Sequence, residues 1–143
     1  MAAQSSAKTV WEGDLAHGAG VTTPDSGAFD DVDVTWSSRT SRSAGKTSPE
    51  ELLAAAHASC YSMALSHELA EAGTPPDRLE ATATVDFEPG EGVRSSHIVV
   101  RGRVPGIDQD RFSEAARAAG EGCPISGALK GNLEITVDAT LES

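Results

Sequence analysis

The sequence contains few cysteines, few aromatic residues and few basic residues. Among its 143 residues there are two cysteines, and phenylalanine, tryptophan and tyrosine together make up 4%. Lysine and arginine number 11 against 22 aspartates and glutamates, so the formal net charge is −11 at pH 7. Binding to nucleic acid or to an anionic membrane needs a basic surface. The charge therefore argues against both kinds of partner.

Long hydrophobic runs are also absent. No apolar run approaches the ~18–20 residues that span a bilayer, and the first residues, MAAQSSAKTVWEGD, lack the apolar centre of a signal peptide. We therefore expect a cytoplasmic protein with no membrane partner. In a reducing compartment, two cysteines are more often redox-active or catalytic than structural. Neither cysteine has a second ligand at zinc-site spacing, so we expect no metal.

The residue pattern predicts one α+β domain over residues 1–143, long enough to bury a core without disulfides or metal. The predicted order is βββ-α-ββ-α-α-β, with a long central helix packed between sheet portions. A polar loop is expected at 39–46. Strands are expected at 8–16, 18–27, 31–38, 78–89, 96–106 and 133–143, and helices between Ser48 and Gly73, at 108–122 and at 124–131.

The long helix has clear start signals. Ser48 is a good N-cap, Pro49 occupies the first helical position, and Glu51 completes a capping box. The helix is roughly 23 residues or about 35 Å long, and its alanine-rich first half is small-sided on every face. A helix that is apolar all round must be buried all round. One chain of this size has little to cover it with, so we expect two copies of the helix to pack in a dimer.

The two cysteines occupy different helical positions. Cys60 lies mid-helix, away from the helix dipole, and an ordinary thiol is only a few per cent thiolate at pH 7. Cys60 is therefore either a nucleophile that a cation stabilises or a small buried apolar residue. Cys123 precedes Pro124 at a helix start. That position suits a resolving thiol, which condenses with the sulfenic acid that a peroxide leaves on a first cysteine.

Three further side chains allow two interpretations each. His57, one turn before Cys60, is either a base for that cysteine or a packed, hydrogen-bonded helix residue, which is the commoner case. Phe112 and Met63 either line an apolar substrate pocket or belong to the core, and the core is favoured.

SPEELLAAAHASCYSMALS together with GCPIS resembles the OsmC/Ohr family of thiol peroxidases, the osmotically inducible protein C and organic hydroperoxide resistance proteins. WEGD and LEITVDATLES fall where that family has similar segments, so the resemblance covers nearly the whole chain. It implies an OsmC-like fold and an intertwined homodimer with two sites at its interface. It also implies peroxiredoxin-like reduction of organic hydroperoxides and, less efficiently, of hydrogen peroxide. The implied reductant is an external dithiol such as a lipoyl group on a protein, and no metal, haem or flavin is implied.

The resemblance also implies the site residues. Cys60 is the peroxidatic cysteine, Cys123 is the resolving cysteine, and the two form a disulfide. Arg39 stabilises the thiolate, and Glu50 orients Arg39. The arginine lies shortly before the long helix, as in OsmC-type members, and Arg42 is a nearby substitute.

Helix geometry separates Glu50 from Cys60. Ten residues span about 15 Å along a straight helix, and the two side chains do not share a face. Antiparallel pairing of two copies about Ala55 would place Glu50 of one chain opposite Cys60 of the other. The alternative is that Arg39 alone reaches across while Glu50 of its own chain orients it.

Two other functions remain open. One is a non-enzymatic dimeric stress or binding protein whose cysteines only fill space. The other is acyl transfer by a Cys60–His57 pair.

Overall fold

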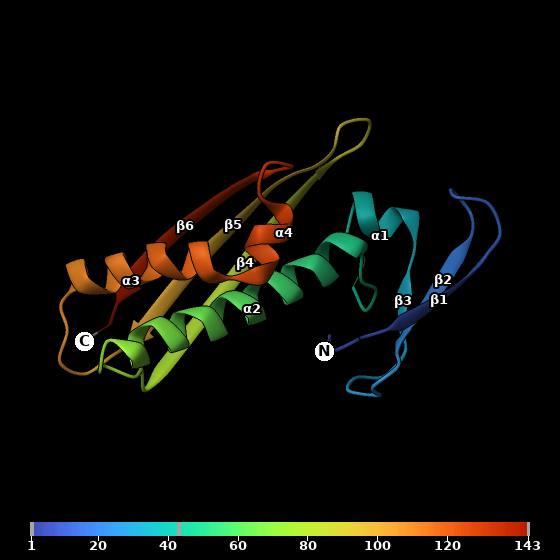
Figure 1. Ribbon diagram of the computed structural model, residues 1–143. Helices are drawn as coiled ribbons and strands as arrows, with labels where there is room; N and C mark the ends of the chain where they lie inside the picture. Colours follow the sequence, from blue (N-terminus) through green and yellow to red (C-terminus); the bar gives the residue numbers. More distant parts are fainter. Residues whose placement is uncertain (1, 43, 143) are drawn as a thin grey trace. The chain divides into compact units, whose positions relative to one another are not determined.

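The computed structural model describes residues 2–42 and 44–142 and has an α+β fold (Figure 1). The chain divides into two compact units, Met1–Leu52 and Leu53–Ser143. The element order is β1-β2-β3-α1-α2-β4-β5-α3-α4-β6. The predicted order is confirmed, with one additional short helix, α1.

The N-terminal unit contains a three-stranded antiparallel sheet. Its strands β1 (Ala7–Glu12), β2 (Ala19–Pro24) and β3 (Val32–Val34) follow one another as a meander, as predicted. A side chain on Gly20 would come within 2.8 Å of the Trp11 ring. The absence of a Cβ at this position therefore leaves room for the indole. Val10 is 52% and Trp11 39% exposed, so this small sheet leaves apolar surface uncovered within the single chain.

Helix α1 (Trp36–Thr40) replaces the end of the strand predicted at 31–38 and the start of the loop predicted at 39–46. A reciprocal capping box starts it: the Ser38 N–H donates to the Thr35 hydroxyl at 3.0 Å, and the Thr35 N–H donates to the Ser38 hydroxyl at 2.9 Å. Serine and threonine side chains at this spacing satisfy the first N–H groups of a helix. Arg39 therefore lies on a helix rather than in a loop.

The C-terminal unit is built on a mixed sheet. Strands β4 (Arg78–Glu88) and β5 (Gly92–Arg103) are antiparallel, and β6 (Glu134–Leu141) lies parallel to β5 at the edge. Helices α3 (Gln109–Gly122) and α4 (Pro124–Leu129) form the crossover from β5 to β6. Figure 1 shows them on the same face of the sheet as α2 (Pro49–Glu71).

Alternate residues of β5 point into the core between this sheet and its helices. Gly102 is one of them, and a side chain there would come within 2.6 Å of the Phe112 ring. Phe112 is fully buried, which confirms the core interpretation for this residue. Met63 is 73% exposed, so the same prediction is wrong for Met63 in the single chain. The buried apolar cluster comprises Tyr61, Leu65, Leu69, Ile98, Val100, Val104, Phe112, Ala119 and Cys123.

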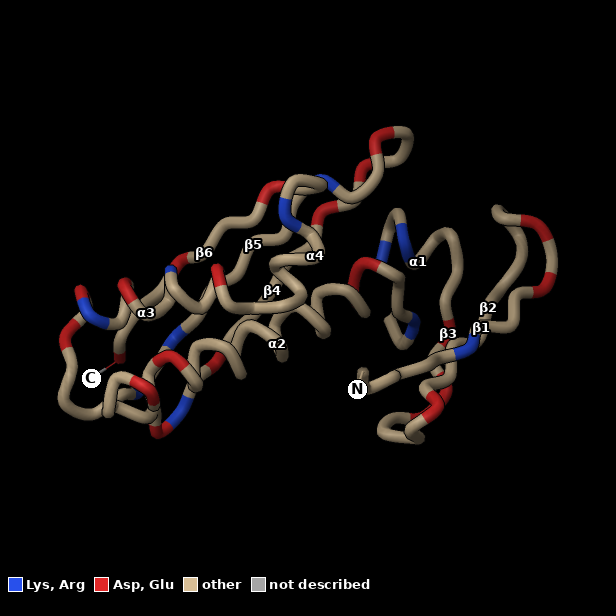
Figure 2. Tube along the Cα trace, viewed as in Figure 1, with Lys and Arg blue, Asp and Glu red and all other residues tan. Residues whose placement is uncertain are grey.

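The charge is spread over the chain. Figure 2 shows acidic positions in both units with the fewer basic ones scattered among them. Among the helices of the described residues, none is both long and apolar enough to cross a membrane.

Candidate active site

The fold of the C-terminal unit brings the two cysteines together. Their sulfur atoms lie 3.3 Å apart although the residues are 63 positions apart in the sequence. Cys60 comes from α2, and Cys123 is both the C-cap of α3 and the N-cap of α4. Both are free thiols, Cys60 half-buried and Cys123 buried. The 3.3 Å separation compares with the ~2.05 Å of a disulfide bond.

The two thiols differ in acidity. Burial raises the pKa of Cys60; the Ile125 backbone N–H of α4 opposes this, and the neighbouring Cys123 raises the pKa further. Burial also opposes ionisation of Cys123, but the Ser126 backbone N–H, the Ser126 hydroxyl and the Cys60 thiol outweigh it and lower the pKa of Cys123. Hydrogen bonds to a thiolate favour the charged form. Within this unit, Cys123 is therefore the more acidic thiol, and Cys60 needs a further positive charge to become a nucleophile.

The N-terminal unit holds the predicted arginine and glutamate as an ion pair. Arg39 Nε donates to both carboxylate oxygens of Glu50 at 3.1 Å, and Nη2 donates to one of them at 2.9 Å. Glu50 is buried, whereas the Arg39 side chain is 32% exposed and lies 5.9 Å from the centre of the Trp36 ring. Such a two-point contact fixes the plane of a guanidinium. Within one chain, Glu50 therefore holds the Arg39 guanidinium at two points.

The alternative arginine is held at a different carboxylate. Arg42 Nη2 donates to Glu51 at 3.0 Å, and both side chains are exposed. Glu51 also accepts from the Thr47 hydroxyl at 2.6 Å, and its backbone N–H donates to the Ser48 hydroxyl at 3.0 Å. The predicted N-cap at Ser48 is thus present, and Glu51 belongs to the helix start.

His57 is fully buried, and serine hydroxyls contact both of its ring nitrogens. Nδ1 lies 2.6 Å from Ser96 Oγ and Nε2 lies 2.8 Å from Ser126 Oγ. Burial lowers the pKa of His57, so the imidazole is neutral at pH 7. Because both ring nitrogens are hydrogen-bonded, the structure supports the second interpretation of His57, a packed, hydrogen-bonded helix residue. It leaves no nitrogen to act as a base for Cys60.

Ser96 and Ser126 are site residues that the sequence analysis missed. Ser96 occupies an inward position of β5 in line with Ile98 and Val100, and Ser126 is the third residue of α4. A polar residue on the apolar face of a strand needs a buried partner. That break in the alternation of β5 was the available signal for Ser96.

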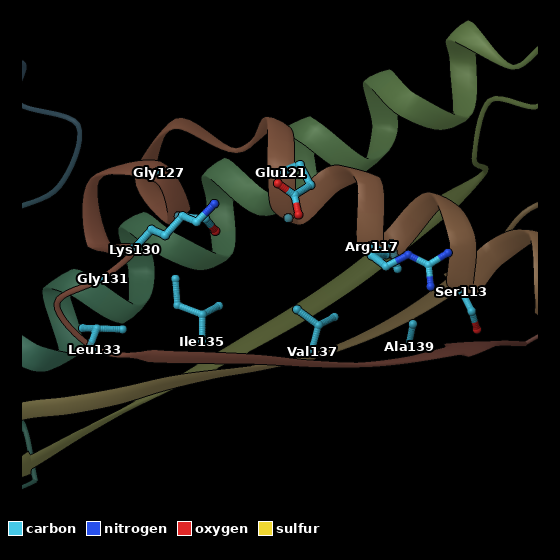
Figure 3. Close-up of a pocket in the computed structure, with 13 residues that line it drawn as sticks. Ser113, Arg117, Glu121, Gly127, Lys130, Gly131, Leu133, Ile135, Val137 and Ala139 are labelled. Carbon is cyan, nitrogen blue, oxygen red and sulfur yellow. The ribbon is translucent and has the colours of Figure 1, made fainter.

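A pocket of about 610 Å³ lies between α3, α4 and β6 (Figure 3). Leu133, Ile135, Val137 and Ala139 form one apolar wall, which comes from β6 and the residue just before it. Charged side chains of the two helices and the loop after α4 stand opposite, as Figure 3 shows for Arg117, Glu121 and Lys130. Ser126 also lines the pocket. The pocket can admit a small apolar molecule.

Between residues 2 and 42 and between 44 and 142, no group of three or more histidine, cysteine, aspartate or glutamate side chains is arranged to hold a metal ion.

The structure has a mixed sheet with a helical crossover, a cysteine in the long helix α2 and a second cysteine at the start of α4. These features define a class of protein with a pair of adjacent thiols. The family described as "OsmC-like protein" matches residues 42–138. The chain is 40% identical over 136 residues to Peroxiredoxin OsmC of Escherichia coli (strain K12), covering 93% of each sequence. The chain therefore belongs to the OsmC-like protein family.

A more distant relative has a solved structure. Over 121 residues the chain is 27% identical to the organic hydroperoxide resistance protein OhrB of Bacillus subtilis (strain 168), covering 84% of this chain and 88% of that protein. The crystal structure of OhrB matches with a TM-score of 0.68 at 28% identity, covering 94% of this chain and 97% of that one. The predicted OsmC-like fold is confirmed.

Proposed function

We propose that this protein is a cysteine-based peroxidase that reduces organic hydroperoxides and, less efficiently, hydrogen peroxide. The observation that carries the proposal is the 3.3 Å separation of the Cys60 and Cys123 sulfurs. The relatives named peroxiredoxin and organic hydroperoxide resistance protein support the same chemistry. Cys60 is the peroxidatic cysteine and Cys123 the resolving one.

The reaction has two steps on the protein and one reductive step. The Cys60 thiolate attacks the terminal oxygen of the hydroperoxide, the O–O bond breaks, and an alcohol leaves with a sulfenic acid on Cys60. Cys123 then attacks the Cys60 sulfur, and a disulfide forms with release of water. An external dithiol, such as a lipoyl group on a protein, reduces the Cys60–Cys123 disulfide by thiol–disulfide exchange and is itself oxidised to a disulfide, which restores both thiols. These steps use no metal, haem or flavin.

Arg39 supplies the charge that Cys60 needs. Since burial raises the pKa of Cys60, an adjacent cation is required for a thiolate at neutral pH. Arg39 and Glu50 are paired in one chain, so they act as one group. We place this pair beside the cysteine pair of a partner protomer in an intertwined homodimer with two sites at its interface.

Exposed apolar side chains support the homodimer. Val10 and Trp11 of β1 and Met63 of α2 are large and exposed in the single chain, and a partner would remove them from water. Free thiols persist in a reducing compartment, so we place the protein in the cytoplasm.

Replacing each cysteine tests the proposal. Cys60→Ser should abolish consumption of an organic hydroperoxide, because the first nucleophile is gone. Cys123→Ser should consume about one equivalent and then stall as a sulfenic acid that over-oxidises. Hydroperoxide loss, with and without a dithiol, is the measurement.

Two results would contradict the two-cysteine mechanism. One is normal turnover of Cys123→Ser with dithiol. The other is a parent protein that consumes no hydroperoxide, which the alternative of a non-enzymatic dimeric stress or binding protein predicts.

A further inference from the structure

Three buried polar side chains connect the core to the second cysteine. Ser96 of β5, His57 of α2 and Ser126 of α4 are each almost completely buried. His57 lies between the two serines at 2.6 and 2.8 Å. A buried polar group is retained at low cost only when it is hydrogen-bonded. This chain of groups ties α4 to α2 and to the sheet.

The chain ends on Cys123. The Ser126 backbone N–H donates to the Cys123 sulfur at 3.5 Å, which makes Cys123 the N-cap of α4. The Ser126 hydroxyl and the Ile125 backbone N–H, both of α4, favour the charged form of the same thiol and lower the pKa of Cys123. The residue that receives the His57 contact is therefore also the residue that holds Cys123.

The direction of the hydrogen bonds follows from donor counting. A serine hydroxyl has one proton, and a thiolate accepts only. The Ser126 hydroxyl donates to Cys123 only when His57 Nε2 carries the proton and donates to Ser126 Oγ. Nδ1 then accepts from Ser96. In the other tautomer, the Ser126 proton points to His57, and Ser126 would favour the neutral thiol of Cys123.

We propose that His57 and Ser126 are positioning residues that hold Cys123 at the start of α4 and present it as a thiolate for the resolving step. This proposal rests on the proposed function of Cys123 as the resolving thiol. The Cys123 thiolate attacks the sulfenic sulfur of Cys60, the S–S bond forms and the S–O bond breaks. The hydroxide that leaves takes a proton from solvent and becomes water, and His57 stays neutral throughout.

Within the single chain, and among the residues that the structure describes, hydrogen bonds rather than a cation lower the pKa of Cys123. The titratable groups that face Cys123 from α2 are Cys60 and Tyr61. Burial raises the pKa of Tyr61, whose hydroxyl donates to the Ala116 carbonyl of α3 at 2.7 Å, so it is a neutral phenol. Hydrogen-bond donors of α4 are therefore the main stabilising groups.

Alkylation of Cys123 tests the proposal without any peroxide chemistry. In a Cys60→Ser background, the rate of reaction with iodoacetamide is measured against pH. Ser126→Ala keeps the backbone N–H but removes the hydroxyl, and His57→Leu removes the donor behind it. Ser126→Ala should raise the apparent pKa of Cys123 by about one unit, since one hydrogen bond to the charged form is lost. His57→Leu leaves the Ser126 hydroxyl in place without the group that orients it, so it should raise the pKa of Cys123 by less than Ser126→Ala does.

Two variants separate this effect from general loss of packing. His57→Gln keeps an amide N–H that can donate to Ser126, so it should return the pKa of Cys123 toward the parent value. Ser62→Ala removes a hydroxyl that donates to the Ala58 carbonyl in α2 and should leave the pH profile unchanged. Thermal unfolding of each variant verifies that it folds. If Ser126→Ala does not fold, the comparison of His57→Leu with His57→Gln still tests the proposal.

The resolving step is then measured in protein that retains Cys60. After one equivalent of hydroperoxide, Ser126→Ala should form the disulfide about tenfold more slowly at a pH below the Cys123 pKa. Its sulfenic acid should be trapped by dimedone, and the first step should keep its rate. An unchanged alkylation profile in Ser126→Ala and His57→Leu, or an unchanged rate of disulfide formation, would overturn the proposal. Failure of the proposed function appears separately, as a parent protein that consumes no hydroperoxide.

Discussion

At the scale of single residues, the surroundings of the two cysteines shift the pKa values of two identical thiols in opposite directions. Burial opposes ionisation of both thiols, and only at Cys123 do hydrogen bonds, those of Ser126 foremost, outweigh it. Because the sulfurs are 3.3 Å apart, ionisation of one opposes ionisation of the other, and the pair titrates as a unit. A peroxidatic role for Cys60 therefore requires a cation that lies closer to the Cys60 sulfur than to the Cys123 sulfur.

Arg39→Ala should raise the pKa of Cys60. An opposite charge within ~4–6 Å lowers a thiol pKa by roughly one to three units, and its removal should shift alkylation of Cys60 to higher pH by that amount. The measurement is the pH dependence of Cys60 alkylation in a Cys123→Ser background. Arg42→Ala is the matched control, because Arg42 pairs with Glu51 at the exposed helix start. A shift with Arg42→Ala alone would show that the arginine is wrongly assigned.

The same scale shows what the sequence could reveal about the site. The motifs around Cys60 and Cys123 marked both cysteines, and Arg39 and Glu50 followed from the family resemblance. The partners of His57 could not be found in this way, because Ser96 and Ser126 are 39 and 69 positions away. Contacts between residues so far apart in the sequence depend on how α2, β5 and α4 pack together, and helix periodicity does not specify this packing.

At the scale of elements, local signals predicted the long helices and the strands. The proline at the first position and the Ser48 cap placed the start of α2 correctly. Helix α1 was missed because a five-residue helix has too little periodicity to compete with the alternating valines before it. Its capping box at Thr35 and Ser38 was the stronger signal.

Gly102→Ala should destabilise the C-terminal unit. The new Cβ would lie 2.6 Å from the Phe112 ring, and overpacking of this kind costs about 1–3 kcal/mol. Gly120→Ala is the matched control in α3, since nothing lies within 4 Å of its Cβ position. It should stabilise the helix by about 0.5–1 kcal/mol. Urea unfolding of both variants gives the two free energies, and equal effects would contradict this packing.

At the scale of the whole molecule, the predicted site has two halves in different units of the chain. The thiol pair lies in Leu53–Ser143 and the Arg39–Glu50 pair in Met1–Leu52. The sequence could predict the composition of each half and the alanine-rich helix that suggested a dimer. It could not show which protomer supplies which half, because symmetric pairing depends on surfaces rather than on local pattern.

Mixed dimers decide between the two arrangements. One protomer carries Glu50→Ala and the other Cys60→Ser, and the isolated heterodimer is assayed with an organic hydroperoxide. If each site combines residues of both protomers, one site keeps both groups intact, and about half of the parental activity per dimer returns. An inactive heterodimer would show that Glu50 serves the cysteine of its own chain.

Thiol titration after oxidation tests the central claim most directly. The parent protein is treated with substoichiometric organic hydroperoxide, and free thiols are counted before and after addition of a dithiol. A peroxidase that uses both cysteines loses two thiols for each hydroperoxide consumed, as a Cys60–Cys123 disulfide, and recovers both with dithiol. Loss of one thiol or none for each hydroperoxide, or loss that a dithiol does not reverse, would contradict the account.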